Sequence, residues 1–252
     1  MTLRVNKQAV AQAFGRAAHS YNQHAELQRR CGEQLMSLID ITPYHRILDA
    51  GCGTGWFSQR WRERGCEVTA LDLSAAMLAQ AQNCQVAHHY LHGDIDAIPL
   101  PDRAVDLCWS NLAVQWCDDL AHALNQLCRV TRVGGKVLFS TLAADSLSEV
   151  RDAWLQVDGA VHVNPFLPVE QIAAAAAGRS MQLSQQTLTL AFPDVLSAMR
   201  SLKGIGATHV HQGRSAGLMT RQRLQQLENV WQRDARGFLL SYHLVFGVIH
   251  CE

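Results

Sequence analysis

The sequence predicts an α/β protein with a mostly parallel sheet of seven strands and a helical cap. From residue 46 onward, short apolar runs alternate with segments of helical periodicity, which is typical of repeated βα units. A glycine-rich turn directly follows the first of these runs, as expected where a parallel strand leads into a helix. Two mainly helical segments, 1–40 and 194–234, stand outside the alternation. We therefore expect residues 1–252 to form a single domain whose cap consists of these two segments.

Length and composition set the first limits on function. The 252 residues are 48% hydrophobic, enough for a sizeable core, and 22 basic residues balance 22 acidic residues. This balance gives no indication of binding to nucleic acid or to a membrane surface. The sequence shows neither a signal-peptide pattern nor a membrane span, so we expect a cytoplasmic protein. The eight cysteines form no CxxC pair and the 12 histidines no HExxH motif, so we expect no metal site.

The first forty residues have the periodicity of helices. Val10, Phe14, Ala17 or Ala18, and Tyr21 recur at spacings of three and four positions, which places them on one helical face. A second apolar set follows around Leu35, and the dipeptide Thr42-Pro43 is expected to end the helical segment.

The expected strands are short apolar runs bounded by turn residues. They cover residues 46–50, 67–72, 87–94, 105–111, 136–142, 186–192 and 241–249. Helices are expected at 56–64, 74–82, 119–131 and 168–178, with two more between 194 and 234. Gly134-Gly135 is predicted to form the turn into the fifth strand.

The glycine-rich turn, DAGCGTG at 49–55, combines three glycines with an acid. Gly51, Gly53 and Gly55 follow the first strand and open a helix, the place where open parallel sheets bind ligands. The dinucleotide fingerprint requires a third glycine at position 56, which is Trp56 here. A pyrophosphate beside Asp49 would also meet a like charge, whereas an ammonium or sulfonium ligand would be attracted.

The same stretch resembles the first motif of class I S-adenosylmethionine-dependent methyltransferases, an acid, one further residue and then GxGxG. The resemblance implies a Rossmann-like sheet with an antiparallel last strand. It also implies that S-adenosylmethionine is the methyl donor and S-adenosylhomocysteine the product.

Further cofactor contacts are implied by this resemblance. Asp72 ends the second strand, where its carboxylate can accept hydrogen bonds from both ribose hydroxyls, although an acid here also suits NAD. Leu73 and Met77 would flank the adenine. In GDIDAIPL, at 93–100, Asp94 would accept from the adenine amino group and Ile95 would cover the ring; Gly-Asp could also be a simple turn.

The segment after the fourth strand, SNLAVQWCDD, is expected to lie between cofactor and substrate. Asn111 and Ala113 would lie near the methionine end of the cofactor, together with Cys52 of the glycine loop. Gln115 and Trp116 would face the substrate, although Trp116 could equally be a core aromatic.

The cap contains an unusual run of positive charge. Between Asp194 and Glu228 there is no acid, but there are five basic residues: Arg200, Lys203, Arg214, Arg221 and Arg223. Such a run often forms a solvated helix face. The absence of interspersed acids favours a surface for an anionic partner instead.

Three segments resemble the malonyl-acyl-carrier-protein O-methyltransferases of biotin synthesis: AFGRAAHSYNQHAELQ at 13–28, NLAVQWCDDL at 111–120 and RSLKGIGATH at 200–209. The resemblance extends over nearly the whole chain. It implies methylation of the free carboxylate of malonyl-acyl-carrier protein, which then serves pimeloyl and biotin synthesis. A malonyl carboxylate has a pKa of about 4, so it is ionised at neutral pH and needs no general base.

On this hypothesis the catalytic residues are Arg200 and Tyr21. Arg200 would hold the non-attacking carboxylate oxygen, and Tyr21 would donate a hydrogen bond from the N-terminal helices. Lys203 and His209 would be further substrate contacts. Alternatively, Arg200 or Lys203 meets the phosphopantetheine phosphate or the acidic carrier protein.

The residues leave other functions open. A methyltransferase for a small molecule, such as a quinone precursor or an aconitate-like carboxylate, would use the same cofactor motifs. A non-catalytic binding module could use the same fold as a scaffold. A nicotinamide-dependent dehydrogenase ranks last because of Asp49 and Trp56.

Overall fold

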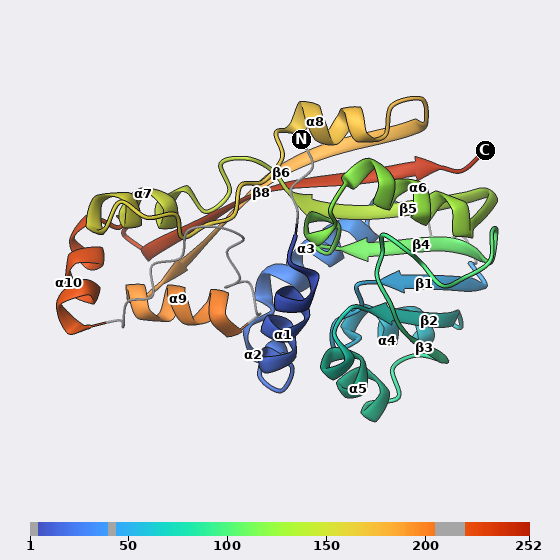
Figure 1. The fold of residues 1–252 in the computed structure, drawn as a ribbon, viewed down its shortest axis with the longest axis horizontal. Helices are drawn as coiled ribbons and strands as arrows, with labels where there is room; N and C mark the ends of the chain where they lie inside the picture. Colours follow the sequence, from blue (N-terminus) through green and yellow to red (C-terminus); the bar gives the residue numbers. More distant parts are fainter. Residues whose placement is uncertain (1–4, 40–43, 205–219) are drawn as a thin grey trace.

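A computed structural model describes residues 5–39, 44–204 and 220–252, and a mixed β-sheet forms its centre (Figure 1). Seven strands form a continuous path in the order β3-β2-β1-β4-β5-β8-β6. The strands are β1 (Arg46–Ala50), β2 (Glu67–Asp72), β3 (His89–His92), β4 (Val105–Asn111), β5 (Thr131–Leu142), β6 (Ser180–Phe192), β7 (Arg233–Asp234) and β8 (Gly237–His250). The first five are parallel, and β8 runs antiparallel to both β5 and β6. The predicted fold class is confirmed, with one unpredicted two-residue strand, β7, paired to β8.

The helices of the described residues lie on both faces of the sheet and beyond one end of it (Figure 1). They are α1 (Lys7–Ala17), α2 (Tyr21–His24), α3 (Glu26–Met36), α4 (Trp56–Glu63), α5 (Ala75–Asn83), α6 (Leu120–Val130), α7 (Ser148–Val157), α8 (Val169–Ala175), α9 (Val195–Gly204) and α10 (Arg221–Val230), with a 3-10 helix, η1 (Val114–Trp116). Within the described part of the chain, none of these helices has the length and apolar character needed to cross a membrane.

The parallel strands are apolar on both faces because helices cover both of them. Successive residues of β1 show this, since Ile47 and Leu48 are both fully buried but belong to different hydrophobic clusters. The cluster around Ile47 includes residues of α3 and α4, and the cluster around Leu48 includes residues of α6 and α8. Because helices occupy both faces of the sheet, a ligand can be bound at the carboxyl ends of β1, β2 and β4.

The two long strands β6 and β8 carry the cap. They pair along their whole length, from Ser180 opposite His250 to Phe192 opposite Phe238, and project beyond the parallel strands (Figure 1). Helices α7, α9 and α10 pack together at this projecting end, and α9 also contacts α2. Helices α9 and α10 lie within the predicted cap segment 194–234. Helix α7 lies outside both predicted cap segments, 1–40 and 194–234, and was not predicted.

Several element boundaries differ from the predictions. Strand β6 begins at Ser180 rather than at 186, because pairing with β8 satisfies the backbone of a polar stretch. Strand β5 begins at Thr131, so Gly134-Gly135 lies within it, at an irregularity in its pairing with β4, rather than forming a turn before it. Strand β3 and helix α8 are shorter than expected, and α3 ends at Met36. The predicted stop at Thr42-Pro43 lies outside the described residues.

We predict that Gly247→Ala destabilises the sheet. Gly247 of β8 lies opposite Phe139 of β5, and a Cβ at this position would come within 2.2 Å of the buried phenyl ring. Such overpacking is expected to lower the free energy of unfolding by about 2–3 kcal/mol in urea denaturation. Adding Phe139→Leu makes room for the methyl group, so the double variant should lose less stability than the sum of the two single variants. Additive losses would contradict the predicted clash.

Candidate active site

The glycine loop between β1 and α4 brings the backbone close to two neighbouring segments. Gly51 and Gly55 have positive φ angles of 79° and 82°, a conformation that glycine adopts without strain. A Cβ on Gly51 would lie 2.3 Å from the Cβ of Ala113, and one on Gly55 would lie 2.2 Å from Val86. The loop is therefore restricted to glycine by both conformation and space.

A pocket opens beside this loop, at the carboxyl ends of β1, β2 and β4. We call it the donor pocket. It collects most of the residues predicted to bind the cofactor: Gly51, Gly53, Asp72, Leu73, Met77, Asp94, Ile95, Asn111 and Ala113. The sequence motifs thus converge on one cavity although they come from the segments that follow four different strands.

A smaller hollow, which shares Gly51 and Asn111 with the donor pocket, adds two of the predicted residues and one that was missed. It is lined by Asp49, Cys52 and Asn111, and also by Arg29 of α3. The Arg29 guanidinium donates a 2.7 Å hydrogen bond to the carbonyl of Asn22. This hollow brings a guanidinium and a carboxylate together, as recognition of an amino acid's carboxylate and ammonium groups requires. Gly55, by contrast, lines neither space.

Two carboxylates dominate the electrostatics of this site, Asp49, which is buried, and Asp72, which is half-buried. Asp49 accepts a 2.6 Å hydrogen bond from the hydroxyl of Ser58. Burial raises the pKa of Asp49 to about 7; the Ser58 bond lowers it, and the nearby charge of Asp72 raises it. Asp72 accepts backbone hydrogen bonds from Gly53 (2.8 Å) and Ser74 (2.7 Å), and burial still raises its pKa to about 6. Because a nearby positive charge would stabilise the ionised form of both carboxylates, their raised pKa values favour a cationic ligand here.

Helix α1 forms part of the wall of the donor pocket. Lys7 donates hydrogen bonds to Asp94 (3.0 Å) and Asp96 (2.8 Å), and both ion pairs are largely shielded from solvent. Lys7 was not predicted as a site residue. Its contact places the N-terminal helix directly against the carboxylate expected to accept from adenine.

A second pocket, which we call the acceptor pocket, adjoins the donor pocket. Both are lined by Phe14, Tyr21, Leu112 and Trp116, so these side chains form a shared wall. The acceptor pocket is also lined by Gln115, as predicted, and by unpredicted residues including Gln28, His162 and Tyr242. The Oε1 atoms of Gln28 and Gln115 are buried without a hydrogen-bond partner, which is characteristic of a polar binding site.

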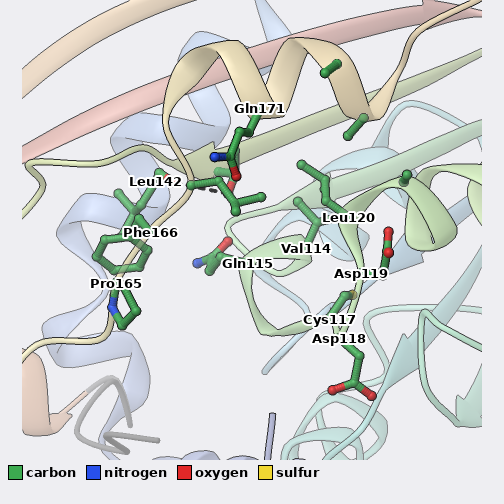
Figure 2. A pocket seen from close by; sticks show the side chains of 15 residues that line it. Val114, Gln115, Cys117, Asp118, Asp119, Leu120, Leu142, Pro165, Phe166 and Gln171 are labelled. Atoms are coloured by element: carbon green, nitrogen blue, oxygen red, sulfur yellow. Dashed lines mark hydrogen bonds between the residues drawn. The ribbon is translucent and has the colours of Figure 1, made fainter. Parts of the chain in front are cut away.

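A third, larger pocket, the outer pocket, continues from the acceptor pocket through Gln115, Leu142 and Phe166, which line both. Figure 2 shows Gln115 between Leu142 and Phe166 on one side and Leu120 on the other, with Gln171 of α8 above. The walls near Gln115 are mostly apolar.

The basic residues of the cap lie in different environments. Arg200 and Lys203 are exposed on α9, whereas Leu202 of the same helix lines the acceptor pocket. Arg221 is exposed, but Arg223 donates a 2.8 Å hydrogen bond to the carboxylate of Asp158. This acid comes from another part of the chain, which the charge count over 194–228 did not include. His209 and Arg214 lie outside the described residues.

We predict that Asp49→Asn stabilises the ligand-free protein at high pH. The folded-state pKa of Asp49 is raised, so the stability that its protonated form provides is complete at low pH and lost as pH rises towards about 7. Relative to wild type, the variant should gain about 2–3 kcal/mol in unfolding free energy as pH rises from about 5 to about 8. It should also bind S-adenosylmethionine about tenfold more weakly or worse, measured by calorimetry. An equal stability difference at both pH values would contradict the raised pKa.

Comparison with known proteins identifies the family of this chain. Residues 48–139 match a family model described as "Methyltransferase domain". The chain is 63% identical to malonyl-acyl-carrier protein O-methyltransferase of Erwinia billingiae, over 98% of this chain and 99% of that protein. It is 54% identical to the Salmonella typhimurium protein of the same name, over 97% and 98% of the two chains.

Solved structures show the same fold at low sequence identity. A putative methyltransferase of Bacillus halodurans superposes with a TM-score of 0.62 at 16% identity, covering 86% of this chain and 96% of that one. Geranyl diphosphate C-methyltransferase of Streptomyces coelicolor, solved with S-adenosylhomocysteine, has a TM-score of 0.52 at 16% identity over 86% and 77% of the two chains. The chain uses S-adenosylmethionine and belongs to the malonyl-acyl-carrier protein O-methyltransferase family.

Proposed function

We propose that this protein transfers a methyl group from S-adenosylmethionine to the free carboxylate of malonyl-acyl-carrier protein, giving the methyl ester. The main support is the wall of Phe14, Tyr21, Leu112 and Trp116 that the donor and acceptor pockets share. Ligands in the two pockets would approach each other at this wall. The names of the full-length relatives indicate the acceptor.

The residues of the donor pocket fit the cofactor. Asp72 has its carboxylate fixed by two backbone N–H groups, and its remaining lone pairs suit the ribose hydroxyls. Asp49 and Arg29 lie where the amino-acid end would be held. When bound, S-adenosylmethionine supplies a methyl group on a positively charged sulfur.

The acceptor needs orientation rather than deprotonation. Its carboxylate is already ionised at neutral pH, so the protein has to align one oxygen with the methyl group and exclude water. Burial, followed by the nearby charge of Asp72, raises the pKa of Tyr21 far above its usual value, so its hydroxyl stays protonated and can donate a hydrogen bond. Holding one carboxylate oxygen in this way leaves the other oxygen free to attack.

The exposed cations of α9 fit the carrier protein better than the reacting carboxylate. Arg200 and Lys203 are exposed on α9, and neither lines the acceptor pocket. We therefore assign them to the pantetheine phosphate or the acidic surface of the carrier protein. The mostly apolar outer pocket suits the thioester arm.

A methyl-transfer assay with labelled S-adenosylmethionine tests the function. Malonyl-acyl-carrier protein is expected to gain a base-labile methyl ester. Malonyl-coenzyme A should react with a lower kcat/KM because it lacks the protein surface that Arg200 and Lys203 would contact. Labelling of quinone precursors or aconitate in place of the malonyl thioester would instead identify a small-molecule methyltransferase. No labelling, together with failure to bind the cofactor, would identify a binding module.

Tyr21→Phe tests the proposed hydrogen bond. Loss of the donor should lower kcat for malonyl-acyl-carrier protein about tenfold to a hundredfold, because only the oriented carboxylate reacts efficiently. The dissociation constant of S-adenosylmethionine should change much less. Tyr90→Phe, in β3 and outside both pockets, is the matched control. An unchanged kcat in Tyr21→Phe would remove Tyr21 from the catalytic residues.

A further inference from the structure

The charge of the acceptor pocket is concentrated in one side chain. Among the fifteen described residues that line this pocket, His162 is the only one able to carry a positive charge; the others are apolar, amide or phenolic. We infer that His162 binds the reacting carboxylate and selects acidic acyl groups over neutral ones. This inference rests on the proposed function and assigns the recognition step to a residue outside the basic cap.

The ring of His162 is held firmly from two sides. It stacks on Trp154 of α7 with ring centroids 3.9 Å apart and an angle of 16° between the planes. Its Nε2 lies 3.2 Å from both carboxylate oxygens of Asp158, directly after α7. Only 13% of the His162 side chain is exposed. A side chain fixed in this way loses little conformational freedom when it binds a ligand.

The partners of His162 determine which ring atom serves the ligand. An ionised carboxylate can only accept hydrogen bonds, so Nε2 of His162 is the donor towards Asp158. Nδ1 is then the nitrogen available to the acceptor, and it donates when the ring is protonated.

The surrounding charges make this protonated state compatible with burial. Asp158 also accepts a hydrogen bond from Arg223 of α10, whose guanidinium lies 5.7 Å from the ring centroid of Trp154. The charges of Asp158 and Arg223 cancel, so protonated His162 adds one net positive charge facing the pocket. The other titratable groups that line the pocket are the phenols of Tyr21 and Tyr242, which burial keeps protonated by raising their pKa values. The buried Glu149 of α7 also raises the pKa of Tyr242. A carboxylate therefore finds one matching charge and neutral donors.

Binding measurements with two carrier-protein thioesters test this assignment. Dissociation constants are measured for malonyl- and acetyl-acyl-carrier protein with S-adenosylhomocysteine present, so that no methyl group is transferred. Wild type should bind the malonyl form about tenfold or more tightly than the acetyl form. His162→Gln should bring this ratio close to one while the constant for the acetyl form stays nearly unchanged. His89→Gln is the matched control, since His89 pairs with Glu67 in an exposed position on β3.

The ratio separates recognition from structural support. If His162 had only a structural role, His162→Gln would weaken the binding of both thioesters and leave the ratio of their dissociation constants unchanged. That result would overturn the inference. If His162→Gln does not fold, the same ratio is measured for His162→Asn, which should likewise bring it close to one. An unchanged ratio in His162→Asn would also reject the assignment. Failure of wild type to methylate malonyl-acyl-carrier protein concerns the proposed function and is detected separately in the methyl-transfer assay.

Discussion

The burial of two like charges at the ends of neighbouring parallel strands is the constraint on which the rest of the site depends. Asp49 in β1 and Asp72 in β2 are brought together by the register of the strands, in which Asp49 pairs with Ala70. Three hydrogen bonds, from Ser58, Gly53 and Ser74, offset part of the desolvation. The pKa values of both acids nevertheless remain raised. The ligand-free protein thus keeps an electrostatic penalty that a cationic cofactor relieves, as expected where stability is sacrificed for binding.

The acceptor side depends on a different part of the fold. Its pocket is built from α2 and α3, the segment around η1, the segment after α7, helix α9 and strand β8. The long antiparallel ladder of β6 and β8 holds the cap helices at its projecting end and places Tyr242 in the same pocket as Tyr21. Donor and acceptor recognition therefore share the N-terminal helices, whereas the parallel strands serve mainly the donor side and the cap mainly the acceptor side.

This division explains how much could be predicted from sequence. Strands 46–50, 67–72 and 105–111 match the structure because they are apolar runs bounded by glycine or polar residues, and the cofactor residues lie in the turns that follow them. Helix α7 carries Val150, Ala153 and Trp154 at helical spacing, a signal that was overlooked. Nothing local identifies His162 or Arg29 as site residues, because long-range packing brings them to their pockets. The partner of Arg223 is 65 positions away, so the window of the charge count could not find it.

The two substrates carry opposite charges, and the protein is suited to bind each charge with a different kind of side chain. The reaction consumes a sulfonium cation and a carboxylate anion, so interactions that depend strongly on either charge weaken as the methyl group moves. On the donor side, the two carboxylates can respond by taking up protons, since their pKa values lie near neutrality. On the acceptor side, Asp158 already pairs with His162, since both of its carboxylate oxygens lie 3.2 Å from Nε2. Tyr21, neutral and common to both pockets, is suited to the position between them because its hydrogen bond persists when both charges have gone.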